Sequence, residues 1–223
     1  MSPERIQLIQ QSRPSVIQTS KSNNKPIASR ISSRDYRNEK IERISLNAKY
    51  RTLFGNPSKD FYMMVDGLPG HGKSYWVMEF AEYYNRQIGN VIYYAAEQNG
   101  QNLALQEMQN TLETTFTIER QPKKLSKSDM IKDFNQYDLV VIDSINEMGL
   151  SAKEIKDIRD ASGAAIVGIL QSTKDGQFKG GQEYLHDVDI SVKLNTFKPE
   201  VIKSRYKSIH DEKDRGRVVK INL

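Results

Sequence analysis

The stretch GLPGHGKS, residues 67–74, places three glycines, a lysine and a serine in the spacing G-x-x-x-x-G-K-[ST]. Glycines allow successive backbone N–H groups to turn toward phosphate oxygens, because no Cβ stands in the way. We expect the Lys73 ammonium to reach the β and γ phosphates of a nucleotide and the Ser74 hydroxyl to ligate Mg²⁺. His71 is interpreted as a loop residue rather than a catalyst. The motif predicts a bound triphosphate, with contacts from Gly67, Leu68, Pro69, Gly70, His71, Gly72, Lys73, Ser74 and Tyr75.

A second motif, DLVVIDS at 138–144, ends a run of apolar residues in an aspartate. Asp143 is expected at the carboxyl end of a buried strand, where a carboxylate can hold Mg²⁺ through water. An aspartate in this place can also cap a helix, but the Gly-rich motif upstream favours the metal role. Asp138, which precedes the run, is interpreted as a turn residue. Together the two motifs predict a nucleoside triphosphate and Mg²⁺ as ligands, without specifying the base.

Two further polar residues follow apolar runs. Glu97 ends VIYYAAE, and we expect its carboxylate to polarise a water for in-line attack on the γ-phosphate. Gln171 ends AIVGILQ, where its amide is positioned to contact the γ-phosphate and to sense its loss. The alternatives are an exposed glutamate at a strand end for Glu97 and a loop hydrogen bond for Gln171.

Apolar runs alternate with amphipathic segments along most of the chain. The runs at 61–67, 91–97, 139–144 and 165–171 are typical of parallel strands covered on both faces, and 116–119 is a further candidate strand. Helical spacing occurs at 73–86, 101–112, 125–134 and 151–161. Three short strands, at 190–195, 200–206 and 217–223, follow without helices between them. The pattern predicts an α/β fold with a mostly parallel central sheet, helices on both faces and a C-terminal antiparallel extension.

Positive charge is concentrated near the N-terminus. Residues 1–60 contain twelve Lys and Arg against five Asp and Glu, a net charge of +7 in a chain whose formal net charge is +5, so the remainder carries −2. Residues 12–34 are rich in Ser, Asn and Pro and lack aromatic residues, which is typical of a flexible segment. We therefore predict a flexible basic arm over 1–45 and a single domain over 46–223. The arm suits contact with nucleic-acid phosphates, or it is a solvated tail.

Composition excludes several classes of protein. The chain has no cysteine, which rules out disulfides, thiol nucleophiles and cysteine-ligated zinc. No apolar stretch approaches the roughly 18 residues of a membrane-spanning helix. The N-terminus lacks an apolar secretion signal, although its Arg- and Ser-rich composition leaves an organellar transit peptide open. The expected location is the cytoplasm, with no membrane partner.

Five stretches, in order, resemble the ATPase core of the RadA branch of RecA-like proteins, with the DnaB and KaiC groups as more distant relatives. The resemblance covers roughly residues 50–210. The most specific part is 172–189, because the order T-K-x-G, glycine, then L-H-x-V-D is not general among P-loop proteins. The stretches are GLPGHGKS, YYAAEQNGQNLALQEM, DLVVIDSI, ILQSTKDGQFKGGQEYLHDVDISVKL and KSRY.

The resemblance implies a RecA-like P-loop ATPase that couples ATP hydrolysis to binding or movement of single-stranded DNA in recombination, repair or replication. Glu97 matches the catalytic glutamate of the family, and Gln171 its γ-phosphate sensor. Residues 146–152 and 172–186 correspond to two DNA-binding loops. Lys203 and Arg205 match a K-x-R element that reaches the nucleotide of a neighbouring subunit, which implies a homo-oligomer, either a hexameric ring or a filament. Two exposed charges on an edge strand are the alternative for this pair.

The chain also departs from RadA-like proteins. It lacks their cysteine zinc ribbon and protease-like domain, and the glycine that usually follows the K-x-R element is missing. Phe178 and Tyr184 are the only aromatic candidates for base stacking in the two loops. A phage or mobile-element origin would suit this reduced architecture, so the expected location is the cytoplasm of a bacterium or of a phage-infected host. Two other functions stay open: a KaiC-like regulatory ATPase that acts on protein partners, and a P-loop kinase for a small molecule.

Overall fold

The computed structural model describes residues 31–39, 42–97, 103–171 and 183–207. The chain divides into two compact units, Met1–Lys40 and Ile41–Leu223, each described by itself. In the first unit, helix α2 (Ser33–Asn38) has exposed side chains, and the Ser32 hydroxyl caps it by accepting a hydrogen bond from the Asp35 amide. The second unit contains the elements that carry the predicted motifs.

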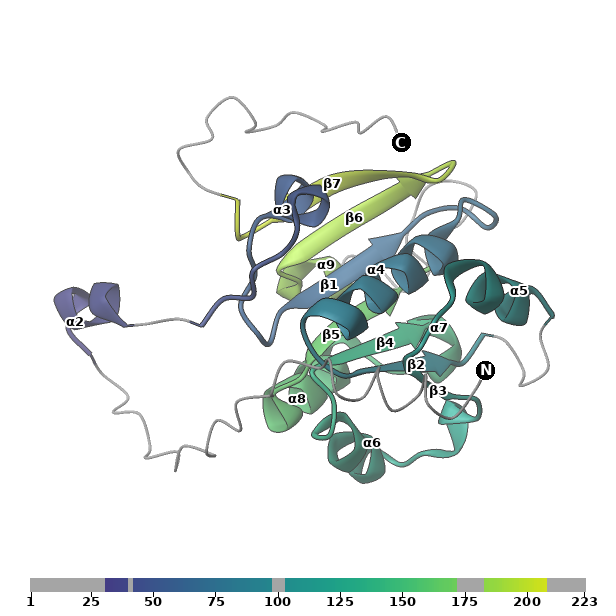
Figure 1. Ribbon diagram of the computed structural model, residues 1–223. Coiled ribbons are helices and arrows are strands. Elements are labelled where there is room, and N and C mark those ends of the chain that lie inside the picture. Colours follow the sequence, from purple (N-terminus) through teal and green to yellow (C-terminus); the bar gives the residue numbers. More distant parts are fainter. Residues whose placement is uncertain (1–30, 40–41, 98–102, 172–182, 208–223) are drawn as a thin grey trace, which may run out of the picture. The chain divides into compact units, whose positions relative to one another are not determined.

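Within the described ranges, the second unit forms a seven-stranded sheet in the order β3-β2-β4-β5-β1-β6-β7 (Figure 1). All neighbouring strands pair in parallel except β6 and β7, which are antiparallel. The predicted α/β class and its antiparallel extension are confirmed, while the predicted strand at 217–223 lies outside the described residues. The strands are β1 (Tyr62–Asp66), β2 (Val91–Ala95), β3 (Thr117–Glu119), β4 (Leu139–Asp143), β5 (Ala165–Ile169), β6 (Ile190–Asn195) and β7 (Lys198–Ser204).

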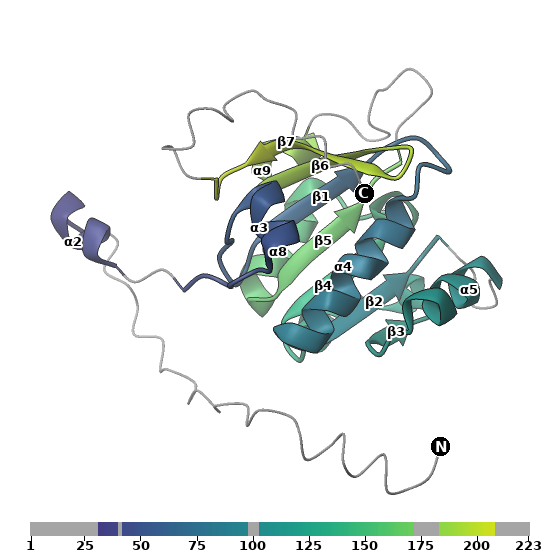
Figure 2. The same ribbon diagram turned by 45° about the horizontal axis from the view of Figure 1, so that its top comes forward.

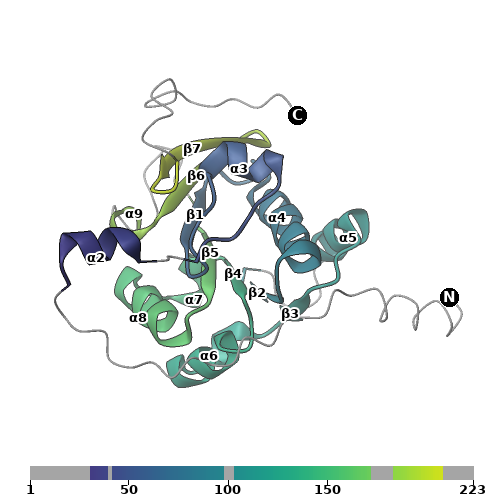
Figure 3. The same cartoon turned by 60° about the vertical axis from the view of Figure 1, so that its left-hand side comes forward.

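Helices cover both faces of this sheet, as Figures 2 and 3 show. On one face lie α3 (Ala48–Phe54), α4 (Lys73–Gln87) and α5 (Leu103–Leu112). On the other lie α6 (Lys127–Phe134), α7 (Ile145–Met148), α8 (Ala152–Ser162) and α9 (Glu183–Asp187). A short 3₁₀ helix, η1 (Pro122–Lys124), precedes α6. The predicted helices at 73–86, 101–112, 125–134 and 151–161 correspond to α4, α5, α6 and α8.

The central strands are buried on both faces, which explains their continuous apolar sequences. Along β1, Met63 and Val65 face the core beneath α4, whereas Tyr62 and Met64 face the core beneath α6–α9. This alternation follows from the two-residue period of a strand. The apolar runs therefore supply two cores, one on each side of the sheet.

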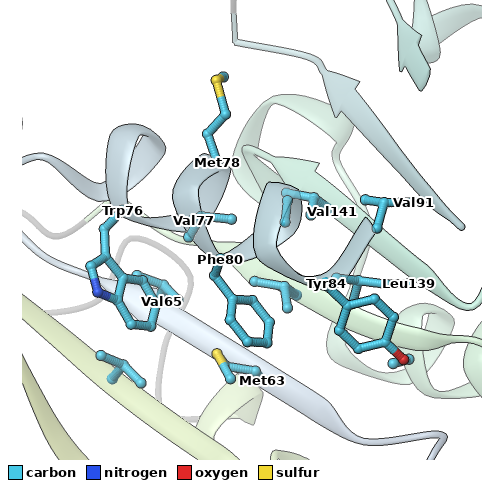
Figure 4. Close-up of a cluster of buried hydrophobic side chains, with 14 of the residues drawn as sticks. Met63, Val65, Trp76, Val77, Met78, Phe80, Tyr84, Val91, Leu139 and Val141 are labelled. Carbon is cyan, nitrogen blue, oxygen red and sulfur yellow. The ribbon is translucent and has the colours of Figure 1, made fainter. Parts of the chain in front are cut away.

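Helix α4 is fixed to the sheet by aromatic side chains four residues apart. Trp76, Phe80 and Tyr84 are buried on one face of the helix, and Figure 4 shows Phe80 pointing toward Met63 of β1. The Trp76 and Phe80 rings stack with centroids 6.3 Å apart. Full burial of a side chain such as Phe80 contributes about 1.5–3 kcal/mol to folding. This packing holds the beginning of α4 in a fixed position beside the end of β1.

The carboxyl ends of β1, β2, β4 and β5 lie at the same edge of the sheet because these strands are parallel. The chain leaves β1 toward β2 and later returns from β5 to β6, on the other side of β1. Such a reversal of strand order leaves a crevice outside the carboxyl ends of the strands, where α/β proteins bind ligands. The loop after β1 is therefore the expected ligand-binding position of this fold.

The two segments expected to be DNA-binding loops are partly helical. Residues 146–152, predicted as a loop, contain most of α7, a turn at Gly149 and the start of α8. Helix α7 forms because Ile145 is buried against β5, where a Cβ on Gly168 would lie 2.2 Å from its Cδ1. In the segment 172–186, residues 183–186 belong to α9, and 172–182 lie outside the described residues. None of the described helices is long and apolar enough to cross a membrane.

Candidate functional site

The loop between β1 and α4 has the backbone that its glycines permit. Gly72 precedes α4 with φ 84° and ψ 19°, a left-handed conformation that favours glycine. Gly67 has φ 153°, and a Cβ there would lie 2.5 Å from the carbonyl oxygen of Leu194 in β6. The loop is therefore held between α4 and the neighbouring strand.

The amino end of α4 is open to an anion. No side chain caps it, and the N–H groups of the first turn of any helix lack partners within the helix. These N–H groups and the helix dipole together favour negative charge at this position. The sequence prediction of a phosphate-binding loop thus has the local structure that it requires.

The ammonium group of Lys73 lies inside the loop. Its Nζ donates hydrogen bonds to the carbonyl oxygens of Gly67 at 2.9 Å and Leu68 at 3.0 Å, and the residue is 8% exposed. Burial lowers the pKa of Lys73, and the carboxylates of Glu97, Asp143 and Asp66 oppose that change. Phosphate oxygens are better acceptors for a buried cation than the two carbonyls are.

Asp143 ends β4 and is 1% exposed. The Tyr93 hydroxyl donates a hydrogen bond to its Oδ2 at 2.5 Å, while Oδ1 is buried and has no hydrogen-bond partner among the described residues. Burial raises the pKa of Asp143, and the bond from Tyr93 opposes that change. A cis peptide bond joins Asp143 to Ser144. Oδ1 is therefore an acceptor without a partner in the described residues, although Asp143 does not line the cleft described below.

The donor set fits Mg²⁺ held jointly by protein and phosphate. In the described parts of the chain, no group of three or more His, Cys, Asp or Glu gathers as a metal site. Lys73 faces three carboxylates, so the site needs additional positive charge before it can accept a polyanion. The Ser74 hydroxyl and the Asp143 carboxylate, the latter through water, are the groups that would hold the cation.

Glu97 and Gln171 meet across the edge of the sheet. The Gln171 amide Nε2 donates to Glu97 Oε1 at 2.6 Å, and the Gln171 backbone N–H donates to Asn146 Oδ1 at 3.1 Å. Burial raises the pKa of Glu97, and the neighbouring charge of Asp143 raises it further. A carboxylate with a raised pKa, held by an amide beside a buried lysine, is suited to accept a proton from water.

A cleft of about 380 Å³ lies over the loop and brings several of the predicted residues together. Gly67 and Leu68 do not line it and instead accept the hydrogen bonds of Lys73. His71 also lies outside the lining, with its ring Nδ1 3.4 Å from the Leu194 carbonyl oxygen. The lining residues are Pro69, Gly70, Gly72, Lys73, Ser74, Tyr75, Glu97, Met108, Gln171 and Phe197.

Lys203 and Arg205 lie away from this cleft. Lys203 pairs with Ser191 in the β6–β7 ladder. It lies about six residues along β7 from the β6–β7 turn that carries Phe197, which corresponds to roughly 20 Å. Its Nζ donates to the carbonyls of Leu185 at 3.2 Å and His186 at 3.3 Å. Arg205 forms an ion pair with Asp189 at 3.1 Å. These cations do not reach the cleft of their own chain.

Four residues of the site were not predicted from the sequence: Tyr93, Met108, Asn146 and Phe197. Tyr93 and Asn146 hold Asp143 and Gln171, respectively, in place. Met108 and Phe197 form apolar parts of the cleft. Strand alternation could have placed Tyr93 on the α4 face of the sheet, but the contacts of the other three depend on tertiary packing.

Asp143→Asn should stabilise the fold while removing the charge with which Asp143 would hold a metal ion. The folded protein raises the pKa of Asp143, so the charged carboxylate is disfavoured by folding. The gain in stability should be complete at pH values above the raised pKa of Asp143. It should shrink as the pH falls through that pKa, because Asp143 of the wild-type protein is then protonated and no longer carries the disfavoured charge. The unfolding temperature without ligand should rise, by about 2–4 °C for each kcal/mol of stability gained.

Asp157→Asn is the matched control for that experiment. Its carboxylate is exposed and pairs with Lys127 at 3.0 Å, so removing the charge should leave the unfolding temperature nearly unchanged. If both variants behaved alike, or if Asp143→Asn were less stable near neutral pH, the desolvation argument for Asp143 would be wrong.

Comparison with known proteins gives structural likeness only. No protein-family model matches the chain, and no curated protein matches its sequence. One similar solved structure is the flagellar accessory protein FlaH from Methanocaldococcus jannaschii, with 11% identity, 74% of this chain and 88% of that chain covered, and a TM-score of 0.47. Another is a solved ATPase domain, with 12% identity, 66% of this chain and 78% of that chain covered, and a TM-score of 0.49.

Proposed function

We propose that this protein is a RecA-like P-loop ATPase that hydrolyses ATP with Mg²⁺ and couples hydrolysis to single-stranded DNA in a homo-oligomer. One observation carries the hydrolase part of the proposal. Lys73 at the amino end of α4, Glu97 just after β2 and Gln171 just after β5 line a single cleft. A cation for the phosphates, a base for water and an amide that contacts the base are the groups that phosphoryl transfer to water requires.

The proposed reaction begins when the loop amides and the first turn of α4 hold the β and γ phosphates. Lys73 then exchanges the carbonyls of Gly67 and Leu68 for phosphate oxygens. Mg²⁺, bound through Ser74 and Asp143, would neutralise charge on the β and γ phosphates. Glu97 orients a water and takes its proton as the water oxygen bonds to the γ-phosphorus, while the bond from that phosphorus to the β–γ bridging oxygen breaks and ADP leaves with the electron pair. Gln171 exchanges its bond to Glu97 for one to the γ-phosphate, and so responds to its loss.

DNA as a partner rests on the resemblance of residues 50–210 to RadA-like proteins. A hydrogen bond links the two segments expected to be DNA-binding loops, 146–152 and 172–186. The Tyr184 hydroxyl of the second segment donates to the Leu150 carbonyl of the first at 2.7 Å. Asn146 in turn accepts from the Gln171 backbone. A change at Gln171 would therefore be passed to both segments, which supports a coupling between phosphate loss and DNA contact.

An oligomer would give Lys203 and Arg205 a role. Both lie on or just after β7, an edge strand in the described sheet, and at a distance from the cleft of their own chain. In a ring or filament, a cation from one subunit can stabilise charge developing on the γ-phosphate of the next. We propose this role for the pair, with Arg205 released from Asp189 on assembly.

Phosphate release from Mg–ATP, measured with and without single-stranded DNA, tests the proposed function. We expect turnover to rise at least several-fold on addition of DNA. Turnover that ignores DNA would instead favour a regulatory ATPase, and turnover that requires an added acceptor would favour a kinase. Double-stranded DNA at the same nucleotide concentration is the control, because it presents phosphates without free bases. No phosphate release under any of these conditions would contradict the hydrolase.

A further inference from the structure

The turn between β6 and β7 places an aromatic ring beside the loop. Asn195 pairs with Lys198, so Thr196 and Phe197 form a two-residue hairpin turn. Their φ angles are 49° and 64°, which glycine or asparagine adopts more readily. The Phe197 N–H donates to the His71 carbonyl oxygen at 3.0 Å and fixes the turn to the loop.

One side of the Phe197 ring rests against Gly72. A Cβ built on Gly72 would lie 2.3 Å from Phe197 Cδ1 and 2.6 Å from Cε1. Even so, Phe197 is 54% exposed and lines the same cleft as Lys73 and Ser74. The ring thus has one side on the phosphate-binding loop and another open toward solvent.

The cleft has a polar part and an apolar part. Lys73, Ser74, Glu97 and Gln171 supply its charged and hydrogen-bonding side chains, which the proposed function assigns to the triphosphate and the attacking water. The remaining larger side chains of the lining are Pro69, Tyr75, Met108 and Phe197, and among them only Tyr75 carries a hydrogen-bonding group. A nucleoside attached to the triphosphate would have to lie against these side chains.

We propose that Phe197 is a nucleoside-binding residue, whose exposed ring stacks on the base of the bound nucleoside triphosphate. The inference rests on the proposed function and names how its substrate is recognised. Stacking on an aromatic ring uses the π-face that every base has, and it is largely tolerant of base identity. The nucleoside is then recognised by its face, so ATP and GTP should bind with affinities within a few-fold of each other.

The test compares Phe197→Ala with the unchanged chain for two ligands, a non-hydrolysable ATP analogue and inorganic tripolyphosphate, both with Mg²⁺. The variant should bind the ATP analogue about tenfold more weakly, because stacking is lost. It should bind tripolyphosphate as the unchanged chain does, because that ligand has no base. Phe197→Trp should retain most of the affinity for the analogue, whereas Phe197→Leu should lose most of it.

Three other results of this binding experiment would contradict the inference. Equal weakening of both ligands would show that Phe197 acts by shaping the loop through Gly72, and would overturn the inference. Unchanged affinity for both would show that the ring lies outside the nucleoside site, as a surface for a protein partner would. If the wild-type chain bound neither ligand, both the proposed function and the inference would be overturned. Thermal unfolding of each variant checks that the fold is retained.

Discussion

Glu97→Gln should lower the turnover number for ATP by about 10²–10⁴-fold and leave Mg–ATP affinity nearly unchanged. Glutamine has the shape of glutamate, and its Oε1 can still accept the hydrogen bond that Gln171 donates at 2.6 Å. An amide cannot take a proton from water, so the chemical step alone is lost. Phosphate release and nucleotide titration measure the two quantities separately. Loss of binding in parallel with turnover would contradict a role as base.

The pH dependence of turnover gives an independent readout of Glu97. Its pKa is raised above 4.5, first by burial and then by the charge of Asp143. Since the carboxylate form accepts the proton, turnover should be full above this raised pKa and fall as the pH drops through it. The residual activity of Glu97→Gln should lose the part of this acid limb that belongs to Glu97, and protonation of Asp143, whose pKa is also raised, would account for the part that stays. A limb that persisted in the variant would belong to another group.

The same variant tests the proposed contact between subunits. Glu97→Gln and Arg205→Ala subunits should each have only a small residual activity alone. Mixing them should restore part of the activity, because some interfaces then combine an intact Glu97 with an intact Arg205. A mixed oligomer of confirmed composition that stayed inactive would contradict the role of Arg205. Thermal unfolding of Arg205→Ala controls for loss of its ion pair with Asp189.

Lys73→Ala should reduce turnover by at least about a hundredfold and also weaken binding of Mg–ATP. The ammonium lies at the centre of the loop, bonded to the Gly67 and Leu68 carbonyls, and is poised to move to phosphate oxygens. Removing one well-placed donor from a site where charge develops costs about 10²–10³-fold in rate. Phosphate release and nucleotide titration again measure the two effects. Near-normal turnover in this variant would exclude the loop as the phosphate site.

Lys132→Ala is the matched control for Lys73→Ala. It removes the same side chain from the exposed face of α6, where Lys132 forms only a 3.8 Å ion pair with Asp129. Exposed pairs of this kind contribute little to stability. The control should keep both turnover and affinity, so a loss shared by the two variants would indicate a general effect of charge.

The loop between β1 and α4 could be predicted from the sequence because its signals are local. The spacing of Gly67, Gly72 and Lys73 specifies one loop, and the strand before it and helix after it could be read from periodicity. Glu97, Asp143 and Gln171 were each predicted at or after a strand end, and parallel strands bring such ends to one edge. The structure places all three near Lys73.

Long-range packing determined what the sequence could not predict. Phe197 reaches the loop only through the register of the β6–β7 hairpin, which local periodicity does not fix. Helix α7 lies in a segment that the resemblance gave as a loop, and its four residues have too little periodicity to predict a helix; burial of Ile145 against Gly168 stabilises it. The role proposed for Lys203 and Arg205 would need a second subunit, and their contacts within one chain could not be predicted from the K-x-R spacing.

A crystal structure of the chain with Mg²⁺ and a non-hydrolysable ATP analogue tests the central claim most directly. We predict phosphates on the amides around Gly72, with Lys73 Nζ moved from the Gly67 and Leu68 carbonyls to phosphate oxygens. A water should lie within hydrogen-bond distance of Glu97 and in line with the γ-phosphorus. Nucleotide bound elsewhere, or Glu97 turned away from the γ-phosphate with no water between them, would contradict the account.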